Sequence, residues 1–371
     1  MTLSLYIARM FLKAYLIVTF AFTTILFLVN LAEESRRFVQ SEANAAMLSV
    51  ISLLKLPKTL YEIMPLIMVL SAVVLFVGLS RRSELVIVRA SGRSALRMLV
   101  SPVLVAFLIG LFAIAAGNPI VAATQNRYEQ LRAALRADAS DGSISINKSG
   151  VWMRQSARLP DYPLAQAVIH ARQANGEATQ LFDVSFQIST PDKGPVQRLI
   201  ADEALLVPGA WQLTGVKQWP LDGVSNPETA AKRYDTLDLP TDLTAARIRE
   251  SFGKPSDVPL WQLPAFIASL EEAGFSTRRH QVWMLSELAL PAFLAAMVLI
   301  AAAFTMRHAR QGRTEVMVLL AFGAGLGLFF LRNVAQVLGE SGQVPVMLAA
   351  FAPPVIALIL PLALVLHLEE G

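Results

Sequence analysis

Six long apolar runs constrain the fold of this chain more than any other feature of its sequence. Each run has about 20 residues, the length that crosses roughly 30 Å of hydrocarbon as a helix. Hydrophobic residues make up 54% of the 371 residues and charged residues only 16%, a balance outside that of soluble globular domains. The sequence therefore predicts an integral membrane protein with six helical spans, at 11–32, 60–80, 98–121, 286–306, 315–338 and 345–367.

The first run lacks the small-residue cleavage site of a signal peptide, so we expect it to be retained as a span. Lysine and arginine in the short connections predict its orientation, because such residues concentrate on the cytoplasmic side. Ten of them lie on one side of the spans and four on the other. Both termini are therefore expected in the cytoplasm. The ten are Arg9, Lys13, Arg81, Arg82, Arg89, Arg93, Arg97, Arg307, Arg310 and Arg313, and the four are Arg36, Arg37, Lys55 and Lys58.

The segment between the third and fourth spans, about residues 123–280, differs sharply in composition and is expected outside the cytoplasm. Several stretches alternate apolar and polar residues and are interrupted by Gly, Pro, Asn and Asp, as half-buried antiparallel strands are. They are residues 144–155, 180–190, 196–209 and 210–220. Helices are expected at 124–140, leaving the third span, and at 259–274, leading to the fourth. The sequence thus predicts a small β-sandwich or jelly-roll inserted between two groups of three spans.

Intrinsic chemistry finds little support in the sequence. There is no cysteine, which excludes disulfides and thiolate metal sites. No phosphate-binding Gly-x-x-x-x-Gly-Lys-Ser/Thr loop and no Gly-x-Ser-x-Gly elbow is present, and the four histidines are scattered over different segments without metal-ligand spacing. We therefore expect a protein that is not an enzyme and that binds no cofactor, metal or nucleic acid itself.

Residues 80–94, "SRRSELVIVRASGRS", form the strongest candidate for a docking segment. Ser83 can cap a short helix, Glu84 then lies in its first turn, where the helix dipole favours an anion, and Gly92 can end it. Four successive apolar residues at 85–88 cover every side of so short a helix, so one lipid-facing stripe cannot bury them. We expect this helix to dock in a groove of a cytoplasmic subunit. An ordinary positively charged loop at the membrane surface is the alternative.

This region resembles the LptF/LptG family of lipopolysaccharide export permeases. "LPKTLYEIMPLIMVLSAVVLFVGLS" at 56–80 and "SELVIVRASGRS" at 83–94 are similar to the Pro-Lys turn, second span and coupling helix of that family. The likeness extends over the whole chain and includes "GNPIVAATQNRYEQLRAAL" at 117–135. The terminal "HLEEG" and the neutral coupling segment look more like the LptG branch, whereas "RQGR" at 310–313 resembles LptF.

The resemblance implies a half-transporter in the inner membrane of a Gram-negative bacterium. It would pair with its paralogue, LptF, and dock on a cytoplasmic ATPase, LptB, which uses ATP and Mg²⁺. Glu84, Leu85, Arg89 and Gly92 would be the coupling residues. The pair would take lipopolysaccharide from the inner membrane, and the external jelly-roll would pass it to LptC and a periplasmic bridge of like folds.

Lipopolysaccharide carries acyl chains below a phosphorylated head, so its site needs an apolar cavity with cations at the outer interface. The expected contacts are Arg36, Arg37, Arg132, Arg136 and Arg332, which the spacing of residues along the predicted helices places near one depth. The alternative for each arginine is that it only reaches the phosphates of ordinary lipids.

Two further observations bear on this interpretation. Relatives often have a basic residue near the outer end of the first span, where this chain has Asn30. Gly323, Gly325 and Gly327 in the fifth span would allow close helix contacts, either with the paralogue, as the resemblance implies, or within the subunit. The alternative functions are a membrane-anchored scaffold whose outer β-domain binds a periplasmic ligand, and the permease of an exporter for another lipid or lipoprotein.

Overall fold

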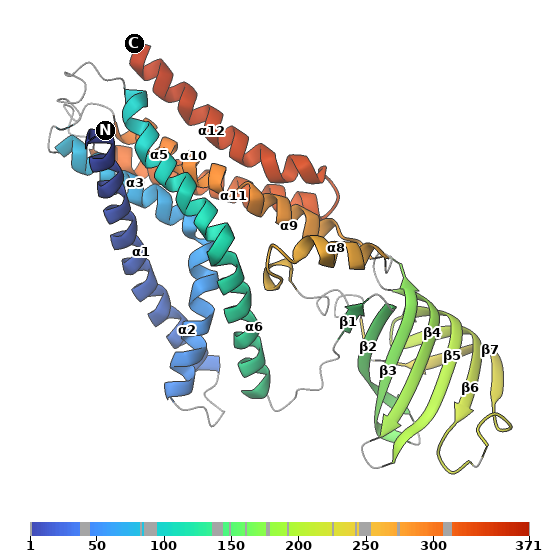
Figure 1. Cartoon of the computed structure of the whole chain (residues 1–371). Coiled ribbons are helices and arrows are strands. Elements are labelled where there is room, and N and C mark those ends of the chain that lie inside the picture. The colour runs from blue at the N-terminus through green and yellow to red at the C-terminus, as the bar shows by residue number, and fades with distance from the viewer. Residues whose placement is uncertain are drawn as a thin grey trace. The chain divides into compact units, whose positions relative to one another are not determined.

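The computed structural model describes residues 2–37, 45–81, 84, 95–135, 144–147, 150–159, 162–175, 179–190, 193–224, 226–241, 243–244, 254–272, 275–306 and 314–370. The chain divides into two compact units (Figure 1). The helical unit comprises Met1–Leu135, Ser256–Leu260 and Arg278–Gly371, and the β-unit comprises Arg136–Pro255 and Trp261–Thr277. The helix that leaves the third predicted span, which the sequence groups with the β-region as a flanking helix, packs with the other long helices up to Leu135.

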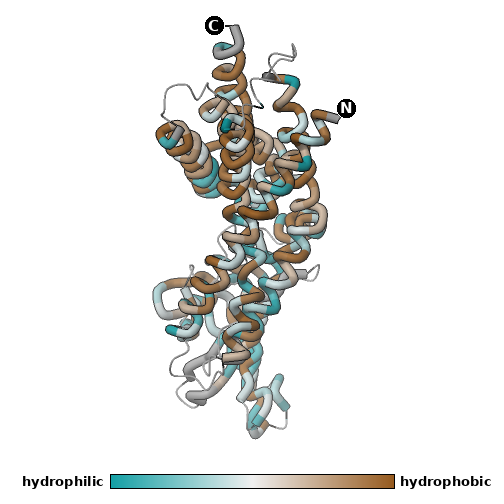
Figure 2. The backbone as a smooth tube through the Cα atoms, turned by 90° about the vertical axis from the view of Figure 1, so that its left-hand side faces the viewer, coloured by the Kyte–Doolittle hydropathy of each residue, from teal (hydrophilic) through white to brown (hydrophobic). Residues whose placement is uncertain are grey.

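The helical unit contains long helices whose residues are mostly hydrophobic (Figure 2). Among the described residues, five helices are long and apolar enough to cross a membrane, and there are six if α9 and α10 together form one bent span. The elements are α1 (Thr2–Arg37), α2 (Ala45–Glu62), α3 (Met64–Arg81), α5 (Ala95–Phe112), the π-helical turn η1 (Ala113–Gly117), α6 (Asn118–Leu135), α9 (Arg278–Leu288), α10 (Leu290–Thr305), α11 (Thr314–Glu340) and α12 (Val346–Glu370).

Helix α10 forms the core of the helical unit. It contacts α3, α5, α11 and α12, and every one of its residues except Ala292 and Phe304 is buried. A helix that is hydrophobic on all sides is the kind that other helices can surround completely. By contrast, α1 and α11 expose large apolar side chains, among them Phe20 and Leu319. Those faces require lipid or another protein as their surroundings.

Two segments depart from a straight, regular α-helix: the α9–α10 pair is bent, and α5 passes into a π-helical turn. Helix α5 contacts the start of α10 close to both irregularities. The axes of α9 and α10 differ by 51°, and Pro291, at the start of α10, cannot donate the backbone hydrogen bond that would continue a straight helix. A Cβ atom added to Gly110 of α5 would lie only 2.5 Å from the Cα atom of Pro291. Only glycine therefore permits this approach. Three residues further along, α5 passes into the π-helical turn η1.

The β-unit contains one antiparallel sheet in which each strand pairs with its neighbours in sequence. Its strands are β1 (Ile144–Asn147), β2 (Gly150–Leu159), β3 (Tyr162–Ala174), β4 (Gln180–Thr190), β5 (Gly194–Val207), β6 (Ala210–Pro220) and β7 (Lys232–Pro240). Alternate residues point to one face and form a core that includes Phe186 and Trp211. Helix α8 (Leu263–Glu272) adds Leu270 to this core. The alternation of apolar and polar residues predicted β4, β5 and β6, and it covered β1 and part of β2 in one stretch, whereas β3 and β7 were not among the predicted stretches. The amphipathic helix predicted at 259–274 corresponds to α8.

The sheet curls around its core, so that strands far apart in the sheet approach each other. The side-chain oxygen of Gln155 in β2 accepts hydrogen bonds from Trp211 Nε1 of β6 at 3.4 Å and from Thr241 Oγ1, just after β7, at 2.8 Å. All three side chains are buried. Burying an amide is costly unless it is hydrogen-bonded, and these two donors satisfy its oxygen.

Candidate functional site

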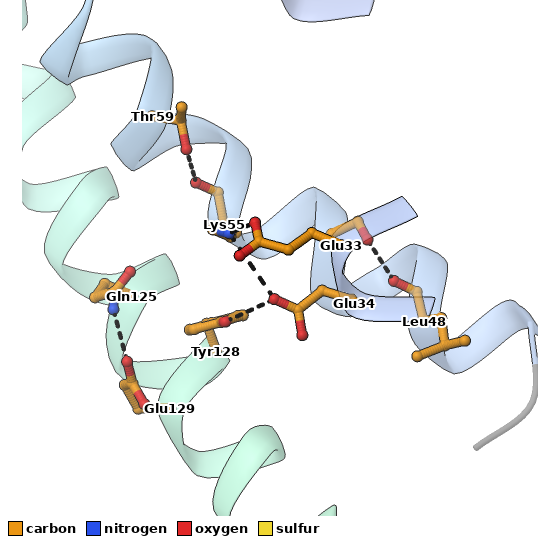
Figure 3. Close-up of polar contacts among 9 residues, drawn as sticks. Glu33, Glu34, Leu48, Lys55, Thr59, Gln125, Tyr128 and Glu129 are labelled. Atoms are coloured by element: carbon orange, nitrogen blue, oxygen red, sulfur yellow. Dashed lines mark hydrogen bonds and ion pairs between the residues drawn. The ribbon is translucent and has the colours of Figure 1, made fainter. Parts of the chain in front are cut away.

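A polar cluster joins α1, α2 and α6 of the helical unit (Figure 3). Glu34 of α1 is completely buried and accepts a hydrogen bond of 2.9 Å from Tyr128 Oη of α6. Lys55 Nζ of α2 lies 2.7 Å from Glu33 Oε2 and 3.9 Å from Glu34 Oε1. A buried carboxylate requires such partners, since its desolvation costs several kcal/mol. The three helices are therefore held together by charge as well as by apolar contact.

Several polar atoms of this cluster are buried and have no hydrogen-bond partner among the residues that the structure describes. They are Glu34 Oε2, Gln125 Oε1, Asn30 Nδ2 and Arg132 Nε. The guanidinium of Arg132 lies 5.8 Å from the ring centroid of Tyr128, which links it to Glu34. Buried polar groups are normally paired, so this cluster has capacity for further polar contacts.

The predicted arginines occupy different positions relative to this cluster. Arg36 is exposed on α1 two residues beyond Glu34, and Arg37 is the last residue of that helix. Arg132 belongs to the cluster itself, whereas Arg136 lies outside the described residues. Arg132 thus lies beside Tyr128, which contacts Glu34 near the C-terminal end of α1, and its contact with a lipid phosphate stays a prediction. The sequence analysis counted Lys55 only for orientation and did not include it among the candidate contacts, although it lies two residues before Pro57.

Arg332 belongs to a second polar cluster. Its Nη2 atom lies 3.4 Å from Glu287 Oε1 of α9 and 3.5 Å from the backbone oxygen of Ser286. Its guanidinium also lies 5.5 Å from the ring centroid of Phe293. Tyr61 of α2 donates a short hydrogen bond to the other oxygen of Glu287. Arg332 therefore holds α11 to α9 in the described conformation.

The sequence signal for this second cluster is the acidic residue Glu287, which was not among the predicted site residues. Glu287 lies inside the run predicted as the fourth span, and an acidic residue within a span normally requires a partner. Its side chain is 5% exposed and that of Arg332 is 13% exposed. Which residues pair with it could not be read from the sequence, because Tyr61 and Arg332 are distant along the chain.

Of the candidate coupling residues, only Glu84 lies within the described residues. Its carboxylate accepts a hydrogen bond from Tyr6 Oη of α1, with oxygen separations of 3.3 and 3.4 Å. Leu85, Arg89 and Gly92 lie outside the described residues. The contact places Glu84 next to the N-terminal turns of α1.

Residues Ser256–Leu260, which follow the strands of the β-unit, belong to the helical unit and contact α6 and α2. Asn118 Oδ1 accepts a hydrogen bond of 2.8 Å from the backbone N–H of Leu260, and Asn126 Nδ2 donates to the backbone oxygen of Asp257 at 3.3 Å. Lys58 Nζ lies 4.0 Å from an oxygen of Asp257. Residues on both sides of the inserted β-unit are thereby anchored in the helical unit.

These features define a class of protein: a polytopic membrane protein with an inserted β-unit, whose polar clusters lie between spans. Within the described ranges, no three metal-ligating side chains group together. Residues 5–367 match the family model for the lipopolysaccharide export system permease LptF/LptG. The chain therefore belongs to the LptF/LptG family.

Individual relatives agree with the family match. The chain is 21% identical over 362 residues to the lipopolysaccharide export system permease protein LptG of Escherichia coli K12, covering 96% of this chain and 94% of the relative. It is 21% identical over 365 residues to LptG of Haemophilus influenzae, covering 97% and 96%. Both relatives carry the LptG name, in agreement with the branch that the coupling segment resembles.

Proposed function

We propose that this chain is a permease subunit that moves lipopolysaccharide out of the inner membrane toward the outer membrane. The observation that carries the proposal is the family match over residues 5–367. Counting α9 and α10 as one bent span gives three spans before and three after the β-unit. In this arrangement both termini are cytoplasmic, and the curled sheet is a periplasmic jelly-roll that passes the lipid onward.

The partners follow from the same proposal. The chain pairs with its paralogue LptF, receives energy from the ATPase LptB through ATP and Mg²⁺, and delivers lipopolysaccharide to LptC and the periplasmic bridge. Gly323 and Gly327, one turn apart on α11, would meet no atom within 4 Å if a Cβ were added, whereas Gly325 faces Val69 of α3. Small residues spaced in this way permit close helix contacts. The exposed side of α11 thus supports a contact with the paralogue, and Gly325 serves packing within the subunit.

Extraction in mild detergent tests the proposal as a whole. The permease complex should retain lipopolysaccharide and a nucleotide-hydrolysing subunit together. Retention of a different lipid, or of a β-unit ligand without any ATPase, would instead support another exporter or a membrane-anchored scaffold. Mass spectrometry of the bound lipids and proteins distinguishes these outcomes.

The coupling role of Glu84 gives the first prediction. Glu84→Ala should reduce ATPase retention several-fold while leaving the permease in the membrane, because charged contacts buried at an interface are costly to truncate. Tyr6→Phe is the matched control, since it removes the hydrogen bond to Glu84 and keeps the carboxylate. Copurification of the ATPase is measured for both variants. Equal losses in the two would indicate that Glu84 acts only by positioning α1, and no loss in either would remove Glu84 from the coupling site.

The polar cluster supports a site for the phosphorylated head group. Arg36 and Arg37 lie at the end of α1, and Arg132 lies at the buried cluster beside Tyr128. Arg136 and Arg332 would contact the same lipid when the permease changes conformation. Arg332 must then exchange its contact with Glu287 for a phosphate. Apolar side chains of the spans hold the acyl chains.

The head-group site gives the second prediction. Arg36→Ala combined with Arg132→Ala should lower lipopolysaccharide retention roughly tenfold. Most of the loss should come from Arg132, because its side chain is partly desolvated, whereas Arg36 is exposed and its contact with a phosphate contributes less. The matched control is Arg127→Ala, an exposed arginine on the same helix as Arg132. Replacement of both site residues by Lys should recover part of the binding, since the charge remains while bidentate phosphate contacts are lost. Unchanged retention in the double alanine variant, with ATPase assembly intact, would place the head-group site elsewhere.

A further inference from the structure

The outer face of the sheet carries its own arrangement of charged and aromatic residues. This is the face opposite the apolar core. The strand register aligns two rows across it: Trp152, His170, Ser185, Ile200, Lys217 and Arg233 in one, and Arg154, Val168, Gln187, Arg198 and Trp219 in the next. We call these two rows the cationic face. Residues remote in sequence therefore form one continuous surface.

Charge is segregated along the strands. The cationic face holds Arg154, Arg198, Lys217 and Arg233, contributed by β2, β5, β6 and β7. Asp202 lies on the same outer face, two residues beyond Ile200 on β5, and is acidic. It lies just outside the two rows. Arg154 and Arg198 are exposed and form no ion pair with any residue that the structure describes. Two cations of this face are thus available to an anionic ligand.

The aromatic residues of this face are held in defined positions. The rings of Trp152 and His170 contact each other in a tilted arrangement, with centroids 4.2 Å apart and planes inclined by 37°. Lys217 Nζ lies 4.7 Å from the ring centroid of Trp219. Arg154 Nε donates a hydrogen bond of 3.0 Å to the side-chain oxygen of Gln166. Flat rings and fixed donors offer a ligand both stacking and hydrogen bonds.

An internal carboxylate already occupies one part of the cationic face. Glu228, on the loop between β6 and β7, accepts a short hydrogen bond from Lys217 Nζ and one of 2.6 Å from Trp219 Nε1. These bonds, from Lys217 first and then Trp219, lower the pKa of the Glu228 carboxyl from its ordinary value. Lys217 and Trp219 together thus form an anion-binding pair, and Glu228 shows how an incoming carboxylate or phosphate would bind.

We propose that the cationic face binds the anionic saccharide portion of lipopolysaccharide, with Glu228 displaced by a phosphate or carboxylate of the ligand. This inference rests on the proposed function, because it takes its ligand from the cargo of the family. From β2 to β5 the face spans about 14 Å, given strand separations of about 4.8 Å. A single phosphate cannot contact both Arg154 and Arg198, whereas an oligosaccharide with several anionic groups can.

A membrane surface is the competing occupant and fits the face less well. Proteins that dock on a bilayer insert a group of apolar side chains below the head groups. The two rows contain only two aliphatic side chains, Val168 and Ile200, on separate strands. The remaining positions carry charges, amides, a hydroxyl and aromatic rings that have polar atoms, which suits a hydrated ligand.

The test uses the full-length permease in detergent and, as probe, lipopolysaccharide from which all acyl chains have been removed. Saturable binding is followed by tryptophan fluorescence or saturation-transfer NMR. Arg154→Glu with Arg198→Glu should weaken probe binding roughly fivefold to tenfold. Arg172→Glu is the matched control. Arg172 lies on the outer face of the sheet but outside the two rows, and it already pairs with Asp183 at 3.3 Å. This control variant should change probe affinity less than twofold. Dephosphorylating a probe that has no other acidic groups should cause a loss similar to that of the double variant.

Glu228→Gln provides a variant whose expected effect cannot arise from misfolding. The amide no longer neutralises Lys217, so probe affinity should rise several-fold. A parent protein that retains intact lipopolysaccharide but does not bind the deacylated probe would overturn this inference and leave the proposed function standing. Failure to retain intact lipopolysaccharide at all would overturn the proposed function itself. Binding to phosphatidylglycerol vesicles without binding to the probe would assign the cationic face to the membrane and would also overturn the inference.

Discussion

Arg332→Met should lower the free energy of unfolding by about 3 to 5 kcal/mol, because it leaves the buried carboxylate of Glu287 without its cation. Arg332 Nη2 lies 3.4 Å from Glu287 Oε1, and the two side chains are 13% and 5% exposed. Methionine keeps most of the apolar contact that the arginine stem makes but supplies no charge. Thermal unfolding of the purified permease in detergent measures the change, together with the amount of protein found in the membrane.

A second substitution separates the ion pair from other effects of Arg332. Glu287→Gln in the Arg332→Met background removes the uncompensated charge and keeps a group that can accept the Tyr61 hydrogen bond. It should recover most of the lost stability, because replacing both members of a buried pair is often close to neutral. If the double variant had the same free energy of unfolding as Arg332→Met alone, the ion pair would contribute nothing to stability. A loss of lipopolysaccharide retention at unchanged stability would instead support the role of Arg332 as a lipid contact.

Gly110→Ala should destabilise the helical unit by about 1 to 3 kcal/mol, the range expected for overpacking a close contact. The added Cβ would lie 2.5 Å from Pro291 Cα, 3.0 Å from Pro291 Cβ and 3.2 Å from Pro291 N. Two of these are backbone atoms at the α9–α10 bend, so the contact cannot be relieved by rotating a side chain. Unfolding temperature in detergent measures the effect.

Gly78→Ala is the matched control for this prediction. Gly78 also lies inside a long helix, α3, but a Cβ there would meet no atom within 4 Å. Alanine has the higher helix propensity, so this variant should be unchanged or more stable by up to about 1 kcal/mol. If Gly110→Ala behaved like Gly78→Ala, the approach of α5 to the bend would be looser than the structure shows.

The sequence predicted the helical and β regions correctly because both have strong periodic signals. The apolar runs at 60–80 and 315–338 correspond to α3 and α11, and the alternation at 180–190 corresponds to the full length of β4. The bend before Pro291 could not be measured from the sequence, since proline indicates a break but not its angle. The π-helical turn η1 had no signal at all, because it results from an offset of one residue within an otherwise ordinary apolar run.

The candidate site was only partly predictable, for a related reason. Charge and helical spacing predicted that Arg132 lies at a similar depth to the arginines at the end of α1, and the structure places Arg132 beside Tyr128. The contact of Tyr128 with Glu34 joins residues 94 positions apart, and that of Tyr61 with Glu287 joins residues 226 apart. Such pairs depend on which faces of the helices meet. A single sequence contains the candidate partners but not the rotation of each helix about its axis.

The central position of α10 has a consequence for the order in which this protein is made. A ribosome completes the helices α1 to α6 at Leu135 and reaches the first residue of α10, Leu290, only after 155 more residues, since 290 minus 135 is 155. At about 5 to 20 residues per second, this interval lasts roughly 8 to 30 s. Throughout it, the surfaces of α3 and α5 that α10 later covers face lipid or an insertion factor. Synthesis of the β-unit therefore falls between synthesis of the early helices and completion of the helical core around α10.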